Sequence, residues 1–182
     1  MPSKLVVVSG PSGVGKSTIV NHVRTIASDI WISVSMTTRT QRSGEVDGRE
    51  YYFVDRETFQ ASIQHGDMLE WAEFAGNLYG TPRQPVLDKL ELGQSVLLEI
   101  ELQGARQVRD NFPEAHLAFI QPPSWQALVE RLEGRGSEDE ASIEARLNVA
   151  KSELLSAGEF DIVLTNHSVE QTAQQLVEFA RT

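Results

Sequence analysis

The octapeptide that begins at Gly10, Gly-Pro-Ser-Gly-Val-Gly-Lys-Ser, limits the fold of this chain more than any other feature. It fits the pattern G-x-x-x-x-G-K-[ST] at every fixed position, and such a match arises by chance in roughly one chain in 150 of this length. The pattern is typical of loops whose backbone N–H groups surround a phosphate. We therefore expect a phosphate-binding loop at this point of the chain.

The flanking residues supply the strand and the helix that such a loop joins. Residues 5–8 form a short apolar run that predicts a buried strand, and residues 18–27 carry a stripe of apolar residues, Ile26 among them, that predicts a helix. The N-terminus of that helix favours an anion. We expect Lys16 to direct its charge at the β- and γ-phosphates and the Ser17 hydroxyl to ligate Mg²⁺. The strand–helix setting disfavours the alternative, a glycine-rich turn with a solvated lysine.

The composition describes one soluble globular domain. The chain has 182 residues, of which 40% are hydrophobic and 23% charged, and this is enough for one buried core but not for two full domains. No apolar run approaches the ~18 residues of a membrane span, and the N-terminus lacks the layout of a signal peptide. We therefore expect a cytosolic (cytoplasmic) protein that does not enter a membrane. The sequence leaves the oligomeric state open, a homo-oligomer included.

The residue types also restrict the ligands. The chain has no cysteine, and its four histidines include no pair at zinc-ligand spacing, so we expect any metal to be Mg²⁺ carried by a nucleotide. Sixteen basic residues against 26 acidic ones give a net charge of −10, which opposes nonspecific binding to nucleic acid or to an anionic membrane. A phosphate-binding protein of this charge must gather its arginines locally.

Predicted strands and helices alternate along the chain, except in residues 36–81. The expected core strands are residues 5–8, 30–35, 96–101, 116–121 and 160–165. This alternation predicts an α/β fold, a three-layer sandwich around a five-stranded, mostly parallel sheet. We expect residues 1–34 and 82–182 to form the core, residues 35–81 to form a small inserted lobe of mixed α+β structure, and residues 133–142 to form a lid.

Two groups of polar residues in the inserted lobe each allow two interpretations. Arg39, Arg42 and Tyr51 lie in a polar stretch that is either a solvated loop or a site for a second phosphate. Glu70 stands among apolar neighbours, where an unpartnered carboxylate is costly. It is either a ligand-binding acid or a carboxylate on the outward face of a strand.

Two further carboxylates, Glu99 and Glu101, end a predicted core strand. The carboxyl ends of the strands in an open parallel sheet face the ligand crevice. Both carboxylates are therefore candidates to approach a metal or a substrate, and the alternative is a pair of rim carboxylates with no role.

In these features the chain strongly resembles the guanylate kinase family, which phosphorylates GMP with ATP. The resemblance covers nearly the whole chain, and several of the segments that carry it are absent from P-loop proteins at large. The segments that carry it are residues 9–18, 33–39 with Arg42 and Gly44-Glu45, 48–53, 69–72, 76–81, Gln103-Gly104, 121–124, and the arginines of the lid and the following helix. The resemblance implies a P-loop NTPase type of fold over residues 1–182, ATP and GMP as substrates, and a lobe that binds GMP.

The resemblance also assigns roles to individual residues. The catalytic residues that it implies are Lys16, Arg42, Arg135 and Arg146. The ATP-binding residues are Ser12, Gly13, Val14, Gly15, Lys16, Ser17, Thr18, Arg131 and Asn166. The GMP-binding residues are Ser35, Glu70 and Thr81 at the guanine, Arg39, Arg42, Tyr51 and Tyr79 at the phosphate, and Gly80, Glu99 and Glu101. The metal is Mg²⁺ that arrives with ATP and meets Ser17.

The chain departs from the family pattern at three positions. Glu101 stands where the family usually has Asp, Glu138 stands where Asp often follows the lid arginine, and His167 stands where an acid is more usual. Two other functions are the alternatives to this one. A non-catalytic protein-interaction module on this fold would be expected to lose Lys16 or the lid arginines, and a kinase for another nucleoside monophosphate would not need the set of guanine contacts.

Overall fold

The computed structural model describes residues 3–133 and 140–182. Its central feature is a five-stranded parallel sheet in the order β2-β7-β1-β8-β9. The strands are β1 Leu5–Ser9, β2 Ile30–Ile32, β7 Ser95–Glu99, β8 His116–Gln121 and β9 Ile162–Thr165. Because side chains alternate across a strand, Val6 and Val8 enter one apolar cluster and Leu5 and Val7 enter another.

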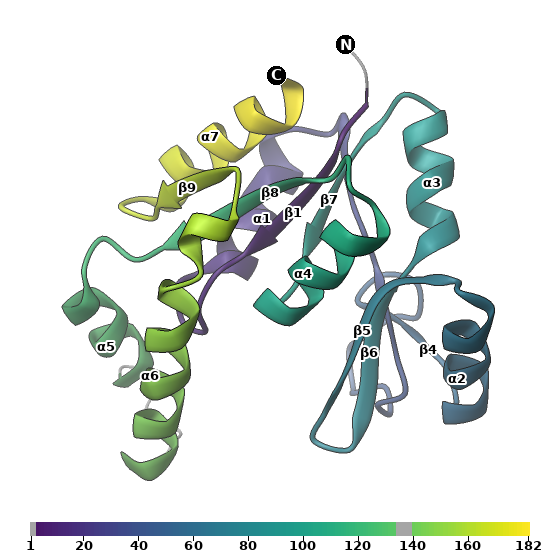
Figure 1. Ribbon diagram of the computed structural model, residues 1–182, viewed down its shortest axis with the longest axis horizontal. Coiled ribbons are helices and arrows are strands. Elements are labelled where there is room, and N and C mark those ends of the chain that lie inside the picture. Colours follow the sequence, from purple (N-terminus) through teal and green to yellow (C-terminus); the bar gives the residue numbers. More distant parts are fainter. Residues whose placement is uncertain (1–2, 134–139) are drawn as a thin grey trace.

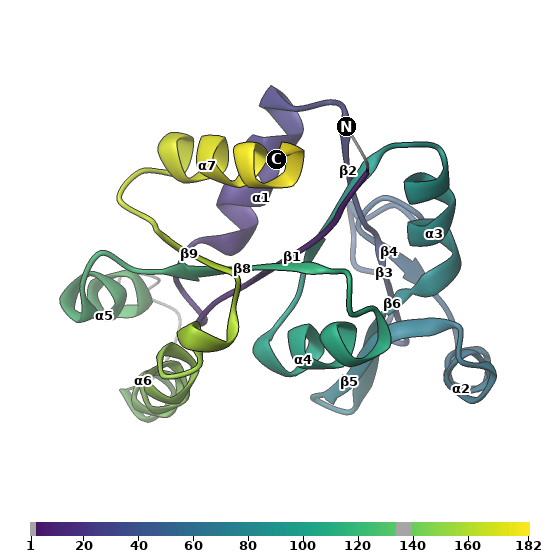
Figure 2. The same cartoon turned by 45° about the horizontal axis from the view of Figure 1, so that its top comes forward.

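Helices cover both faces of this sheet (Figure 2). Helices α1 Lys16–Ile26 and α7 Val169–Arg181 pack on the face that includes Val6 and Val8. Helices α3 Arg83–Glu91 and α4 Leu102–Asn111 supply apolar side chains to the opposite face. Helices α5 Trp125–Glu133 and α6 Glu140–Leu154 pack on each other, and a 3₁₀ turn at Ala157–Glu159 follows them. No helix in the described ranges is long and apolar enough to cross a membrane.

A second sheet of four strands lies beside the first (Figure 1). Its strands are β3 Ser35–Thr37, β4 Tyr51–Phe53, β5 Met68–Phe74 and β6 Asn77–Pro82, in the order β4-β3-β6-β5. The pairing is mixed, because β3 runs parallel to β4 and antiparallel to β6. Helix α2 Arg56–His65 packs on this sheet through Phe59, which contacts Met68 and Leu78 in a small separate cluster.

Helix α4 joins the two sheets along the outer edge of β5. The side-chain amide of Gln107 donates to the carbonyl of Trp71 at 2.9 Å, and its oxygen accepts from the Trp71 N–H at 3.0 Å. Asn111 donates to the carbonyl of Leu69 at 2.9 Å. Two side chains of one helix thus bond the free backbone groups of an edge strand.

The predicted fold class is confirmed: a five-stranded parallel sheet covered by helices, with a second mixed sheet. The stretch 30–35 was expected to be one strand, and this was wrong. It divides into β2 and the start of β3, which belong to different sheets. Residues 51–53, which end the polar stretch after residue 35, form the strand β4, for which the sequence analysis predicted no strand. Ile26, expected on a buried face, is 42% exposed, so this expectation was wrong; it is the last residue of α1. The predicted lid falls largely on residues 134–139, outside the described ranges.

Candidate active site

The phosphate-binding loop connects β1 to α1, as the motif predicts. Gly10 lies so close to β8 that a Cβ there would overlap the backbone carbonyl of Ile120. Gly15 has a left-handed backbone with φ of 99°, and a Cβ on it would come within 2.9 Å of the side-chain amide of Asn166. The glycine spacing of the motif is therefore required both by the turn and by the neighbours of the loop.

The Lys16 side chain folds back onto this loop, toward Gly10. It is buried, with 8% of the residue exposed, and Nζ donates to the carbonyl of Gly10. The same Nζ forms an ion pair with Glu101 Oε2 at 3.2 Å, although the Glu101 side chain is 70% exposed. The ammonium group thus lies at the loop, where a phosphate would meet it.

Glu99 lies at the end of β7, the strand next to β1. Because Val8 pairs with Glu99 across the two strands, the Glu99 carboxylate comes beside the loop, and Ser17 Oγ donates to its Oε1 at 2.5 Å. Burial raises the pKa of Glu99, while the Ser17 hydrogen bond and the charge of Lys16 oppose that rise. Hydroxyl and carboxylate oxygens suit Mg²⁺ as ligands. In the described part of the chain, no group of three or more His, Cys, Asp or Glu side chains could hold a metal ion.

Helix α6 contacts the loop at Ser12. Arg146 donates to Ser12 Oγ at 2.6 Å, and the carboxylate of Glu153 lies beside the Ser12 backbone N–H. These two residues are seven positions apart, which places them on one face of the helix. Burial raises the pKa of Glu153. Sequence patterns did not single out Glu153, and Arg135, the other arginine expected here, lies outside the described residues.

Arg131 and Asn166 both bond to the loop at the carbonyl of Val14. Arg131 Nη1 donates to this oxygen at 3.0 Å and Asn166 Nδ2 donates to it at 2.8 Å. Beside them is a cavity of about 510 Å³, which opens at the start of α1 and α7. Its lining residues are Gly13, Gly15, Thr18, Arg131, Asn166, His167, Ser168 and Val169. The last three were not predicted as site residues, although they follow Asn166 directly in the sequence.

Glu70 is buried in the second sheet, with 6% of the residue exposed. An irregularity in the pairing of β5 between Met68 and Glu70 lets Leu69 pack into the main core while Glu70 faces Thr81. Thr81 Oγ1 donates to Glu70 Oε1 at 2.6 Å. Burial raises the pKa of Glu70 to about 6, and the hydrogen bonds from Thr81 oppose that rise. The outward-facing alternative for this carboxylate was therefore wrong.

Two more of the predicted GMP residues lie next to this pair. A Cβ on Gly80 would come within 2.5 Å of the backbone oxygen of Glu70, so this position must stay small for the strands to pair. Ser35 and Thr81 each stand one residue beyond the antiparallel pair Met36–Gly80. Register therefore places the Ser35 and Thr81 positions side by side at the same end of the sheet.

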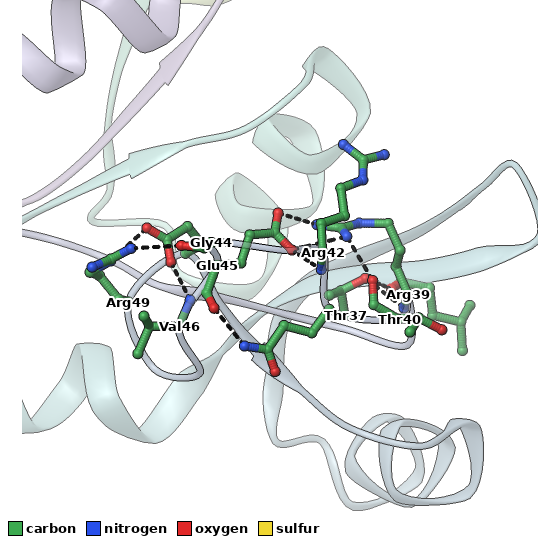
Figure 3. Close-up of polar contacts among 11 residues, drawn as sticks. Thr37, Arg39, Thr40, Arg42, Gly44, Glu45, Val46 and Arg49 are labelled. Atoms are coloured by element: carbon green, nitrogen blue, oxygen red, sulfur yellow. Dashed lines mark hydrogen bonds and ion pairs between the residues drawn. The ribbon is translucent and has the colours of Figure 1, made fainter.

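Glu45 organises the arginine loop that follows β3 (Figure 3). Arg39 donates to both oxygens of Glu45, at 2.8 Å and 3.1 Å, and the Arg42 backbone N–H donates to Oε2 at 2.7 Å. The Arg42 guanidinium points away from Glu45 and makes no hydrogen bond or ion pair within the described ranges. The sequence analysis quoted Glu45 only as part of a family segment and assigned it no role.

Aromatic rings complete this part of the site. The Arg39 guanidinium lies over the ring of Tyr51, 5.4 Å from its centroid. Tyr51 and Tyr79 meet edge to face, with centroids 6.0 Å apart. The structure thus brings together Arg39, Tyr51 and Tyr79, three of the four residues expected at a second phosphate.

Comparison with known proteins identifies the family. A sequence profile described as guanylate kinase matches residues 2–182. The chain belongs to the guanylate kinase family. A curated guanylate kinase from Streptomyces kasugaensis is 58% identical over 96% of this chain and 85% of its own length. A guanylate kinase from Thermobifida fusca is 55% identical over 97% of this chain and 90% of its own length. The crystal structure of guanylate kinase from Anaplasma phagocytophilum superposes with a TM-score of 0.77 at 36% identity, and covers 98% of this chain and 85% of that one.

Membership of the guanylate kinase family makes this chain an enzyme, a kinase among the transferases. Its predicted site residues fall into two sets in space. One set surrounds the phosphate-binding loop and includes Lys16, Ser17, Glu99 and Glu101. The other set lies in the second sheet around Glu70. Helix α4 contacts both sheets, through β1 of the first and β5 of the second.

Proposed function

We propose that this member of the guanylate kinase family transfers the γ-phosphoryl group of ATP to GMP, giving ADP and GDP. The observation that carries the proposal is the buried Glu70 carboxylate, held by Thr81 at 2.6 Å in a chain that also has a phosphate-binding loop. Guanine presents N1–H and the 2-amino group as adjacent donors, and an ionised carboxylate can accept from both. Adenine presents an acceptor at N1 and no 2-amino group, so the same carboxylate would oppose it.

The hydroxyl groups beside Glu70 have different parts in this proposal. Thr81 commits its hydroxyl hydrogen to Glu70 Oε1, so we assign it the task of orienting the carboxylate. Ser35, at the neighbouring position of β3, is the donor that we assign to guanine O6. A site built from such fixed partners rejects a base that lacks the matching groups, because buried polar groups are then left unpaired.

We assign the phosphate of GMP to Arg39, Arg42, Tyr51 and Tyr79. Arg39 is already fixed by Glu45 and by the ring of Tyr51, so it meets a phosphate with little loss of side-chain freedom. Arg42 has an exposed guanidinium that is available to the anion. Arginine donors match phosphate oxygens in pairs, which gives the site direction as well as charge.

On the donor side, we assign the triphosphate of ATP to the loop amides of residues 12–18 and to Lys16. Mg²⁺, when bound with ATP, would neutralise phosphate charge, and the oxygens of Ser17 and Glu99 would hold it there. Arg146 reaches the loop at Ser12, and we assign it, with Arg135, to the charge of the transferring group. Phosphoryl transfer relies mainly on position and charge, so we assign no general base.

A coupled assay of ADP formation with ATP, Mg²⁺ and a panel of nucleoside monophosphates tests the proposal. We expect turnover with GMP and little with AMP, CMP or UMP. Preference for another monophosphate would contradict the guanine assignment and leave a P-loop kinase. Lack of turnover with all of them, with GMP still bound in calorimetry, would indicate a binding module. We propose the cytosol as the location, on the basis of the nucleotide substrates and the absence of cysteine.

A further inference from the structure

Gly104 stands in the first turn of α4, directly against the carboxylate of Glu70. A Cβ on Gly104 would come within 2.8 Å of Glu70 Oε2 and within 3.3 Å of its Cδ. It would also meet Ile100 Cδ1 at 3.4 Å, which is an ordinary contact. The space that a side chain would occupy at position 104 is therefore taken by the Glu70 carboxylate.

We propose that Gly104 is a positioning residue that sets the base selectivity of the acceptor site by reserving room for Glu70 Oε2. The inference rests on the proposed function, because it deepens the part that Glu70 has in guanine recognition. Oε1 is held by Thr81, and Oε2 occupies the space that is left open because position 104 of the opposite helix has no side chain. Both oxygens must be aligned, because guanine offers two donors side by side.

The backbone at position 104 does not itself call for glycine. The glycines with positive φ are at other positions, and Gly104 has an ordinary helical conformation within α4. Glycine is a weaker helix former than alanine. A glycine in this turn therefore weakens the helix, and the close approach of Glu70 is the feature that accounts for its presence.

The carboxylate has little freedom to move away from an added methyl group. Glu70 is buried, its Oε1 is bonded to Thr81 at 2.6 Å, and the preceding Leu69 is packed in the main core. Helix α4 is in turn bonded to β5 through Gln107 and Asn111. A methyl group at position 104 must therefore rotate Oε2 out of line or separate α4 from the strand.

The variant Gly104→Ala provides the test, with Gly158→Ala as its matched control. Gly158 lies in the 3₁₀ turn, where a Cβ would have nothing within 4 Å. The measurements are kcat/KM for GMP and for IMP, KM for ATP, and the thermal midpoint. IMP keeps N1–H and lacks the 2-amino group, so the ratio of GMP to IMP reports how well the carboxylate meets both donors.

For Gly104→Ala, we expect kcat/KM for GMP to fall about tenfold or more, because a misplaced carboxylate leaves buried polar groups unpaired. The GMP to IMP ratio should fall with it, while KM for ATP stays within about twofold and the thermal midpoint does not drop. Gly158→Ala should match the wild type in all four measurements. An unchanged kcat/KM and ratio in Gly104→Ala would overturn the proposal. Equal losses for GMP, IMP and ATP with a lower midpoint would also overturn it, in favour of a structural role.

The double variant Glu70→Asp/Gly104→Ala keeps the test decisive even if Gly104→Ala alone does not fold. Aspartate is one methylene shorter and withdraws the carboxylate from the added methyl group. We expect Gly104→Ala to cost much less in the Glu70→Asp background than in the wild type, which is a coupling between neighbours. If Gly104→Ala does not fold, a folded double variant with the activity of Glu70→Asp supports the proposal, and an unfolded one overturns it. If the wild type itself prefers another base, the proposed function fails instead.

Discussion

Thr81 and Glu70 stand opposite one another on β6 and β5, and the threonine hydroxyl donates to the glutamate carboxylate at 2.6 Å in a fully buried setting. The pair combines a group that only accepts hydrogen bonds with a neighbour that fixes its orientation. Such a carboxylate is costly to bury unless it has partners. The free-energy cost of burying Glu70 is offset when a ligand supplies the remaining hydrogen-bond donors.

Replacing Glu70 by glutamine should depress GMP use severely. The amide keeps the shape, but its NH₂ group faces one of the two guanine donors, so one hydrogen bond is lost and a repulsion is added. We expect kcat/KM for GMP to fall by ~10² or more in the coupled assay, with KM for ATP nearly unchanged. A Glu70→Gln variant that used GMP as well as the wild type would remove Glu70 from base recognition.

The raised pKa of Glu70 predicts how stability varies with pH. Because burial raises this pKa from 4.5 to about 6, the folded chain binds more protons than the unfolded chain between these values. The stability that this group contributes is therefore fully present below pH 4.5 and is lost as pH rises through about 6. In urea unfolding, the free energy of unfolding of Glu70→Gln should increase by about 2 kcal/mol relative to that of the wild type as pH rises from 4.5 to 7.5. A difference that does not change with pH would mean that Glu70 keeps its ordinary pKa.

Replacing Lys16 by alanine should leave the fold intact and lower kcat by about 10²–10³. Its ammonium group bonds to the carbonyl of Gly10 and to Glu101 at the loop, and Lys16 belongs to none of the hydrophobic clusters of the described residues. Circular dichroism and the coupled assay together check this. Loss of helical signal along with activity would show that the lysine is structural, and near-full activity would exclude the loop from the mechanism.

The arginines should divide by the kinetic constant that they affect. Arg39→Ala should mainly raise KM for GMP, because the charge that Arg39 meets exists before transfer. Arg146→Ala and Arg135→Ala should lower kcat with modest effects on GMP binding, because the charge they meet develops during transfer. Glu45→Gln is a useful companion variant, because it loosens Arg39 without removing it and should give a smaller rise in KM. If all three alanine variants changed only KM for GMP, the catalytic assignment of Arg135 and Arg146 would be wrong.

Replacing Glu101 by aspartate, the residue more usual in the family, should have a small effect on ATP. The Glu101 side chain is 70% exposed and pairs with Lys16 at 3.2 Å. Lys16 is buried, but solvent screens the exposed Glu101 carboxylate, so the pair contributes no more than about 1 kcal/mol. We therefore expect the shorter residue to free Lys16 and to lower KM for ATP by up to about fivefold. A large loss of kcat would show instead that the length of Glu101 matters to the reacting groups.

The fold was predictable where the sequence pattern is local and regular. The apolar runs of the five core strands and the intervening helical stretches fix the α/β class, and the glycine pattern fixes the loop between β1 and α1. The division of residues 30–35 was not predictable, because only two residues, Ser33 and Val34, separate β2 from β3 and the alternation continues across them. The strand with which each half pairs decides the outcome, and that is a tertiary effect.

The candidate site was predictable in its phosphate-binding loop and less so in the contacts that hold it. Arg131 bonds to Val14 across a sequence separation of 117 residues. No local pattern signals the contact of Glu153 with Ser12. The burial of Glu70 likewise depends on an irregularity in β5 and on a distant helix, and so the sequence could only offer two interpretations of it.

The side-chain amides of α4 that bond to β5 have a consequence for the behaviour of the protein in a crowded solution. An edge strand with free N–H and C=O groups can recruit a strand from another molecule, and this is a common start of aggregation. On β5, Gln107 and Asn111 already take up the outward groups of Trp71 and Leu69, as a neighbouring strand would. The stretch of β5 on either side of Glu70 is thereby protected from pairing with a strand of another chain.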